Sequence, residues 1–281
     1  MGPMTAIGAA GARAGGRLVG REAALAATGA ALEDALAGAG GLLLVVGEPG
    51  IGKSALLSEQ ARRAAAAGIR VVRGAGWAGA PPYWLWTQVL RGLADDAMPG
   101  VARLLDPGTG AADPHDRFRL FDAVRAALAD NAPLVVVLDD LHVADNDALR
   151  LLDFLHRTLV AERVLLLGAC RDEEAAPALR ALAAAAPGLP LVGLDTDGVA
   201  ALIAEVAGPV PEPAMAEAVR RRCGGNPLFV RELTRLMVAG GKFTGHGGRI
   251  PGGGGEKLRQ RLDPLTAWCR GVGDGAAGEG P

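Results

Sequence analysis

Short apolar runs alternate with segments of helical periodicity through most of the chain. This alternation is typical of a parallel sheet that is covered by helices on both faces. The apolar runs predict five strands, over residues 42–46, 69–72, 134–138, 164–167 and 189–192. Helical periodicity predicts helices over residues 54–67, 83–93, 116–129 and 147–159. The pattern therefore predicts an α/β fold with a five-stranded parallel sheet.

The helix predicted over residues 116–129 has one apolar face. Phe118, Phe121, Val124 and Leu128 follow one another at intervals of three or four residues. We expect this stripe to pack against the core rather than to bind a ligand.

Aromatic residues gather in one stretch of the chain. Trp77, Tyr83, Trp84 and Trp86 include three of the four tryptophans. We expect them to pack a helix on the sheet, and a binding platform is the alternative.

After the fifth strand the pattern changes to helices alone, over residues 196–207, 212–223 and 228–238. This change predicts a helical subdomain over residues 195–239. The chain ends, residues 1–16 and 240–281, are rich in glycine, and we expect the first of them to be a disordered tail.

Composition and charge narrow the class of protein. Hydrophobic residues make up 50% of the 281 residues and charged residues 21%, which is typical of a globular protein. The 29 basic and 31 acidic residues nearly balance, so we expect no direct binding of nucleic acid.

The three cysteines are isolated, which argues against a disulfide framework or a zinc site. No apolar run is long enough to span a membrane, and we expect a cytoplasmic protein.

Residues 47–54 carry the strongest chemical signal, a complete match to G-x-x-x-x-G-K-[ST]. A predicted strand precedes this P-loop and a predicted helix follows it, as the motif requires. Glycines let the backbone N–H groups and the helix dipole face a phosphate. Lys53 would reach the β- and γ-phosphate oxygens, and the Ser54 hydroxyl would bind Mg²⁺. We therefore expect ATP to bind to Gly47, Glu48, Pro49, Gly50, Ile51, Gly52, Lys53 and Ser54.

Two acids follow the third predicted strand and offer the second half of a metal site. Asp139 would hold Mg²⁺ at the carboxyl end of the strand, and a helix-capping acid is the alternative. Asp140 would orient or deprotonate the attacking water. Aspartate is one methylene shorter than the glutamate that often has this role, so we expect slow hydrolysis.

These motifs resemble the AAA-type ATPase module of STAND signal-transduction NTPases, especially that of large ATP-binding LuxR-type transcriptional regulators. The resemblance covers residues 18–269. Residues 18–22, Leu-Val-Gly-Arg-Glu, are similar to the hhGRE box of this family. That similarity implies that Val19, Gly20 and Arg21 lie near the adenine, whereas an ordinary helix start is the alternative.

Three further segments carry the resemblance. Residues 139–145, DDLHVAD, are similar to the family's DDLHWAD stretch, with valine in place of tryptophan. Residues 169–173, ACRDE, are similar to its TYRDE segment, with Ala169 in place of threonine, and this implies that Arg171 senses the γ-phosphate. Residues 224–230, GGNPLFV, are similar to its GxP motif, which implies that Pro227 packs near the adenine and couples the helical subdomain to the nucleotide.

The position of Arg171 also has a geometric argument. In sheets of this class the fourth strand usually lies between the P-loop strand and the Asp139 strand, so its carboxyl end would face the γ-phosphate. The alternative is a surface ion pair of Arg171 with Asp172 or Glu173.

Together these features predict a P-loop NTPase fold of AAA/STAND type, with a nucleotide-binding domain over residues 17–194. We expect an ATP- and Mg²⁺-dependent regulatory switch that hydrolyses ATP slowly or conditionally. A non-hydrolysing nucleotide-binding module and a DNA-associated RecA- or clamp-loader-like ATPase are the alternatives. The resemblance implies that residues 240–281 contain a linker and the truncated start of a winged helix. We also expect a protein partner or a missing C-terminal effector region, and a nucleotide-dependent oligomer.

Overall fold

The structure is a computed structural model that describes residues 18–93, 114–171 and 176–240. The tails expected over residues 1–16 and 241–281, including the start of a winged helix, lie outside these ranges.

The sheet is parallel and five-stranded, as the sequence predicts, with the order β2-β3-β4-β1-β5. The strands are β1 (Gly41–Val46), β2 (Arg70–Ala75), β3 (Leu134–Asp139), β4 (Val164–Cys170) and β5 (Gly188–Pro190). Strand β4 lies between β1 and β3, as expected for this class of sheet. The carboxyl ends of β1, β3 and β4 therefore meet at one edge of the sheet.

Strands β2 and β4 extend three residues beyond their apolar runs, through segments that each contain a glycine. A Cβ atom at Gly74 would lie 2.5 Å from the Leu85 carbonyl oxygen, and one at Gly168 would lie 2.7 Å from Leu44 Cδ2. Glycine is therefore required where a helix or a neighbouring strand comes close to the backbone. Strand β5 is shorter than predicted and begins one residue earlier, and a last hydrogen bond to β1 runs from Leu191 N to the Val46 carbonyl at 2.7 Å.

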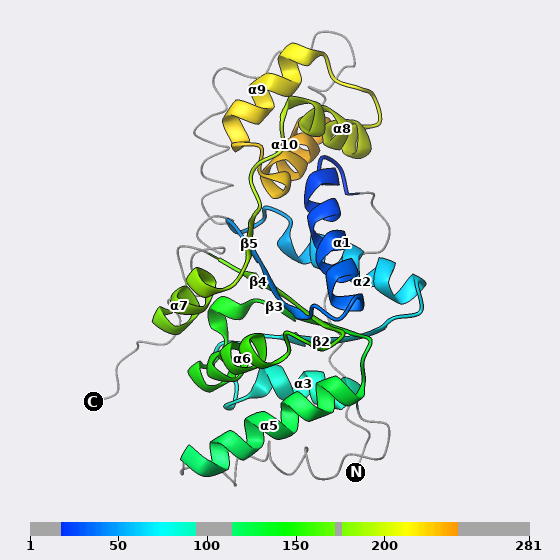
Figure 1. The fold of residues 1–281 in the computed structure, drawn as a ribbon. Helices are drawn as coiled ribbons and strands as arrows, with labels where there is room; N and C mark the ends of the chain where they lie inside the picture. Colours follow the sequence, from blue (N-terminus) through cyan, green and yellow to red (C-terminus); the bar gives the residue numbers. More distant parts are fainter. Residues whose placement is uncertain (1–17, 94–113, 172–175, 241–281) are drawn as a thin grey trace, which may run out of the picture.

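Helices cover both faces of the sheet (Figure 1). Helices α1 (Glu22–Leu36) and α2 (Lys53–Ala66) pack on one face, against Val45, Val135 and Leu167. The other face packs against α3 (Trp84–Leu93), α5 (Pro114–Asp130), α6 (Asn146–Thr158) and α7 (Pro177–Ala185). Alternate residues of each inner strand thus enter two separate cores, as the pleat of a strand requires.

Helices α1 and α7 escaped the sequence analysis. Both are rich in alanine, so their apolar faces contrast weakly with the rest of the helix. Tertiary packing identifies them: Leu25 of α1 and Leu179 and Leu182 of α7 are buried.

The stripe expected on α5 is buried at three of its four positions. Phe121, Val124 and Leu128 are buried, whereas Phe118 is 58% exposed and contacts Phe154 edge to face. The prediction was wrong for Phe118 because this residue lies in the first turns of the helix, beyond the edge of the core.

The helical subdomain consists of α8 (Thr196–Ala207), α9 (Pro213–Cys223) and α10 (Pro227–Ala239). These helices form a group at the top of Figure 1 with a core of their own, which includes Leu202, Val219 and Leu233. Asp195 caps α8 by accepting a hydrogen bond from Gly198 N at 2.8 Å. No helix in the described parts of the chain is long and apolar enough to cross a membrane.

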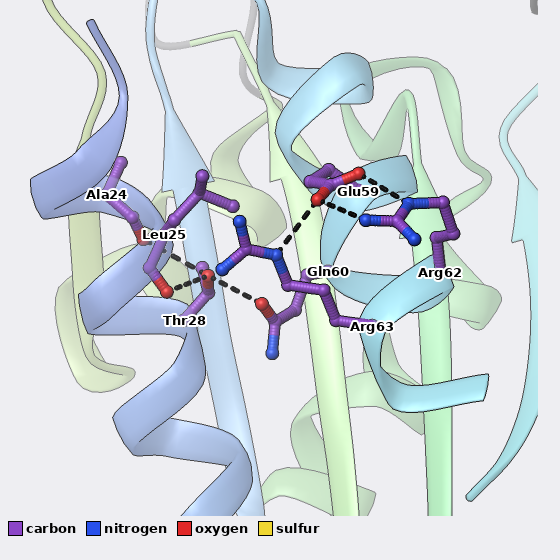
Figure 2. A network of polar contacts seen from close by, with 7 residues as sticks. All are labelled: Ala24, Leu25, Thr28, Glu59, Gln60, Arg62 and Arg63. Carbon is purple, nitrogen blue, oxygen red and sulfur yellow. Dashed lines mark hydrogen bonds and ion pairs between the residues drawn. The ribbon is translucent and has the colours of Figure 1, made fainter. Parts of the chain in front are cut away.

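Helix α2, which begins at the P-loop, is held against α1 by a buried polar contact (Figure 2). Thr28 Oγ1 and Gln60 Oε1 lie 3.4 Å apart, and both side chains are buried. On the exposed side of α2, Arg62 and Arg63 bind Glu59 and lower the pKa of its carboxyl group to about 2. The contact between Thr28 and Gln60 links α1 to the helix that carries Lys53 and Ser54, whereas the ion pairs of Glu59 lie within α2 and support its helical conformation.

Two of the tryptophans provide a test of the packing around α3. Trp86 is fully buried and its Nε1 donates to the Ala148 carbonyl at 2.9 Å, whereas Trp77 is 67% exposed. We expect Trp86→Ala to lower the free energy of unfolding by about 3 to 5 kcal/mol, because it leaves a large cavity and removes the hydrogen bond to the Ala148 carbonyl. Trp77→Ala is the matched control, with an expected change within about 0.5 kcal/mol. Urea unfolding followed by circular dichroism measures both, and equal losses would contradict this account of the core.

Candidate functional site

The P-loop connects strand β1 to helix α2 and depends on glycine at two positions. Gly50 has a φ of +76° and Gly52 a φ of +106°, values that strain any residue with a Cβ atom. A Cβ atom at Gly50 would also lie 2.8 Å from the Leu228 side chain of α10. The loop is thus strongly curved and closely covered by the helical subdomain.

Every carbonyl group from Gly47 to Ile51 accepts a hydrogen bond. Lys53 Nζ donates to the carbonyls of Gly47 and Glu48, at 2.7 and 2.9 Å. The remaining carbonyls are bound as follows: Pro49 by Asn226 Nδ2 at 2.9 Å, Gly50 by Leu228 N at 3.3 Å and Ile51 by the Arg21 guanidinium at 2.7 Å. Within a trans peptide the C=O and N–H bonds point in opposite directions. The amides of Gly50 and Gly52 therefore point away from Asn226 and Arg21, and both glycines line a cavity.

Positive charge gathers where the P-loop enters α2. Lys53 is buried in the first turn of α2, where the helix dipole is positive. Burial lowers the pKa of the Lys53 ammonium group, and the nearby Arg171 guanidinium lowers it further. Arg171 follows the central strand β4 and lines the cavity. This combination of backbone amides, dipole and cations favours a phosphate group.

Asp139 and Asp140 follow one another but have different surroundings. Asp139 ends β3, is hydrogen-bonded to the Ser54 hydroxyl and accepts Asp140 N at 2.9 Å. Burial raises the pKa of the Asp139 carboxyl group, and the Ser54 hydrogen bond acts in the opposite direction. Asp140 is exposed, has a left-handed backbone with a φ of +51° and lines the cavity. The fold therefore separates a half-buried acid beside Ser54 from an exposed acid that faces the cavity.

Ser54 and Asp139 fit a magnesium site. Their oxygen atoms lie within hydrogen-bond reach of each other, and both are hard ligands of the kind that Mg²⁺ prefers. Mg²⁺ usually takes one or two protein ligands and completes its shell with water and phosphate oxygens. The described residues contain no cluster of three or more His, Cys, Asp or Glu that could hold a metal ion.

The cavity has a volume of about 660 Å³ and joins the P-loop to the helical subdomain. Val19, Leu194 and Leu202 give part of its wall an apolar character that suits a planar heterocycle. Its lining comprises Leu18, Val19, Arg21, the P-loop and α2 residues Pro49 to Ala55, Asp140, Arg171, Leu194, Leu202, Glu205, Pro227, Leu228, Arg231 and Arg235. A cavity of this size and polarity can accept a nucleotide.

The segment around Gly20 fits both interpretations of the sequence, a segment beside the nucleotide site and an ordinary helix start. Val19 lines the cavity, and Gly20, with a φ of +63°, is followed by helix α1 at Glu22. Arg21 is buried and donates to the carbonyls of Val192 and Ile51, at 2.6 and 2.7 Å. Its guanidinium group thus joins the P-loop to the segment after β5.

Several residues of the site escaped the sequence analysis. Leu194, Leu202, Glu205, Leu228, Arg231 and Arg235 come from α8, α10 and the segment before them. Helical periodicity places such residues on a face but does not show what that face meets. Asn226 could have been found, because asparagine before proline is typical of a helix N-cap and N1 position.

Asp172 and Glu173, the alternative partners of Arg171, lie outside the described residues.

Comparison with known proteins gives distant solved structures and one family match. No curated protein matches the chain. Among solved structures, RuvB variants from Thermotoga maritima are 19% identical, with a TM-score of 0.49 over 87% of this chain and 70% of theirs. A signal transduction ATPase with numerous domains (STAND) and a tetratricopeptide repeat sensor, from Pyrococcus horikoshii, is 15% identical, with a TM-score of 0.48 over 82% of this chain and 31% of its own.

The family model for the AAA ATPase domain matches residues 17–167, more than half of the chain. This stretch contains the P-loop, the strand that ends at Asp139 and the exposed Asp140. The chain therefore belongs to the AAA ATPase domain family.

Proposed function

We propose that this protein is an ATP-binding regulatory switch whose helical subdomain responds to the bound nucleotide. The observation that carries the proposal is the shared cavity, in which residues of the P-loop face residues of α8 and α10. A ligand in that cavity contacts both units at once. Its binding free energy can therefore shift the population of subdomain positions.

The polar end of the cavity would bind the phosphates. The amides of Gly50 and Gly52 and the N-terminus of α2 would hold the β-phosphate, and Lys53 would turn from its carbonyl partners to the β- and γ-phosphate oxygens. Ser54 and Asp139 would hold Mg²⁺, which neutralises charge on the phosphate oxygens. Val19, Leu194 and Pro227 would enclose the adenine.

Hydrolysis would depend on the acid that faces the cavity. Asp140 would orient the attacking water, and its short, exposed side chain favours a slow reaction. Arg171 would bind the γ-phosphate and so distinguish ATP from ADP. Slow hydrolysis of ATP would fit a regulatory switch better than a motor ATPase.

The biological setting follows from the family resemblance. We propose that the chain acts in signal transduction, as the nucleotide-binding module of a LuxR-type or related STAND regulator. A protein partner or effector region would receive the signal, and ATP would favour an oligomer. A DNA-associated ATPase is the competing function, and stimulation of turnover by DNA would favour it.

The first prediction separates binding from cleavage. We expect Lys53→Ala to weaken ATP affinity by about 1.5 to 3 kcal/mol, because it removes a charged hydrogen bond from the bound state. Asp139→Asn should impair binding only when Mg²⁺ is present. Asp140→Asn should leave affinity nearly unchanged and lower the rate, since its role belongs to the transition state.

Calorimetric titration with and without Mg²⁺, together with single-turnover hydrolysis, measures these effects. Asp147→Asn, which changes an exposed acid of α6, is the matched control. If the wild type hydrolyses ATP no faster than Lys53→Ala does, the protein is a nucleotide-binding module that does not hydrolyse ATP. Loss of binding in Asp140→Asn alone would reverse the roles given to the two aspartates.

The second prediction concerns Arg171. Arg171→Ala should weaken ATP binding by about 1.5 kcal/mol or more and spare ADP, because only ATP offers the γ-phosphate. Arg150→Ala removes an arginine that pairs with Asp147 on the surface of α6 and serves as the control. Equal losses for ATP and ADP, measured by competition titration, would assign Arg171 a structural role instead.

A further inference from the structure

Asn226 connects the helical subdomain to the P-loop without entering the cavity. The residue immediately precedes α10 and is only 2% exposed. Its Oδ1 accepts Leu228 N at 3.1 Å, which caps α10, and its Nδ2 donates to the Pro49 carbonyl at 2.9 Å. One buried amide therefore binds the helix with one end and the P-loop with the other.

The next turn of α10 strengthens this connection. Leu228 N is shared between Asn226 Oδ1 and the Gly50 carbonyl, which lies at 3.3 Å. The Leu228 side chain fills the space beside Gly50, where a Cβ atom would lie 2.8 Å away. Two successive carbonyl groups of the P-loop are thus held by the first residues of α10.

We infer that Asn226 is a positioning residue that sets the P-loop for phosphate binding and transmits occupancy of the loop to α10. The Pro49 carbonyl and the Gly50 N–H belong to one planar peptide, so the hydrogen bond from Asn226 fixes the direction of that N–H. An amide that is already oriented loses less conformational entropy when it binds an anion. This inference rests on the proposed binding of nucleotide, and it names a route through the backbone of the P-loop rather than through contacts with the nucleotide.

The route has two consequences. The β-phosphate is present in both ATP and ADP, so loss of the Asn226 hydrogen bond weakens the binding of both nucleotides equally. Loss of the Arg171 side chain, in contrast, weakens the binding of ATP alone. Coupling between two sites is also reciprocal. A nucleotide that stabilises the P-loop therefore slows the opening of α10, and this effect diminishes when the connection is removed.

A purely structural role for Asn226, as the cap of α10, makes a different prediction. Serine and aspartate are both good N-caps, so Asn226→Ser and Asn226→Asp retain the acceptor for Leu228 N. Serine is too short to reach the Pro49 carbonyl, and an ionised aspartate has no donor for it. The two variants therefore remove the P-loop contact and keep the cap. Asp195→Ala is the matched control, because it removes the cap of α8, which has no hydrogen bond to the P-loop.

The experiment measures ATP and ADP affinities, thermal unfolding and amide hydrogen exchange of α10 for the full chain and the three variants. We expect Asn226→Ser and Asn226→Asp to weaken both nucleotides by about 5-fold, the loss for one neutral hydrogen bond. The nucleotide-induced protection of α10 amides should fall in these variants and persist in Asp195→Ala.

Affinities within 2-fold of wild type would overturn the inference, and so would an equal loss in Asp195→Ala, since a destabilised subdomain would then be sufficient. If Asn226→Ser does not fold, Asn226→Asp alone provides the test. Its carboxylate differs from the native amide by one heavy atom. If the wild type binds neither nucleotide, the proposed function itself fails. If the wild type binds and the variants match it, only the role of Asn226 is refuted.

Discussion

The site depends on the hydrogen bonding of the P-loop carbonyls. A loop that offers its N–H groups to an anion must turn its C=O groups the other way, because each peptide unit is planar. Those carbonyls are costly to leave unpaired in a protein interior. Here Lys53, Asn226, Leu228 and Arg21 bind them. The donors that bind these carbonyl groups therefore fix the direction of the N–H groups, which determines the ligand that the loop can bind.

The donors come from parts of the chain that are distant in sequence. Arg21 precedes α1, Lys53 begins α2, and Asn226 and Leu228 begin the last described helix. The P-loop is therefore the place where the N-terminal segment, the sheet and the helical subdomain are joined. Arg21 extends this connection to Val192, in the segment after β5. A change in the conformation of the P-loop therefore affects its contacts with all three units.

The sheet supplies the chemical groups at one edge. Because β4 lies between β1 and β3, Arg171 follows the strand that separates the P-loop from the two aspartates. The two neighbouring acids differ: Asp140 has a left-handed backbone and an exposed carboxyl group, whereas Asp139 is half-buried beside Ser54. Burial disfavours the charged form of both groups, so it raises the pKa of the Asp139 carboxyl group and lowers that of the Lys53 ammonium group.

The sequence by itself determined the strands, most helices and the P-loop, because these are local patterns: apolar runs, helical periodicity and a motif between a strand and a helix. The position of β4 between β1 and β3 agreed with expectation, since parallel sheets of this class have few arrangements. Local patterns failed where alanine reduced contrast, as in α1 and α7, and where small residues continued strands, as at Gly74 and Gly168. Only the tertiary structure decided that Arg21 and Asn226 bind P-loop carbonyls and that Glu205, Arg231 and Arg235 line the cavity. The reason is physical: a hydrogen bond between residues 49 and 226 depends on how the subdomain packs on the sheet, and no local periodicity records that placement.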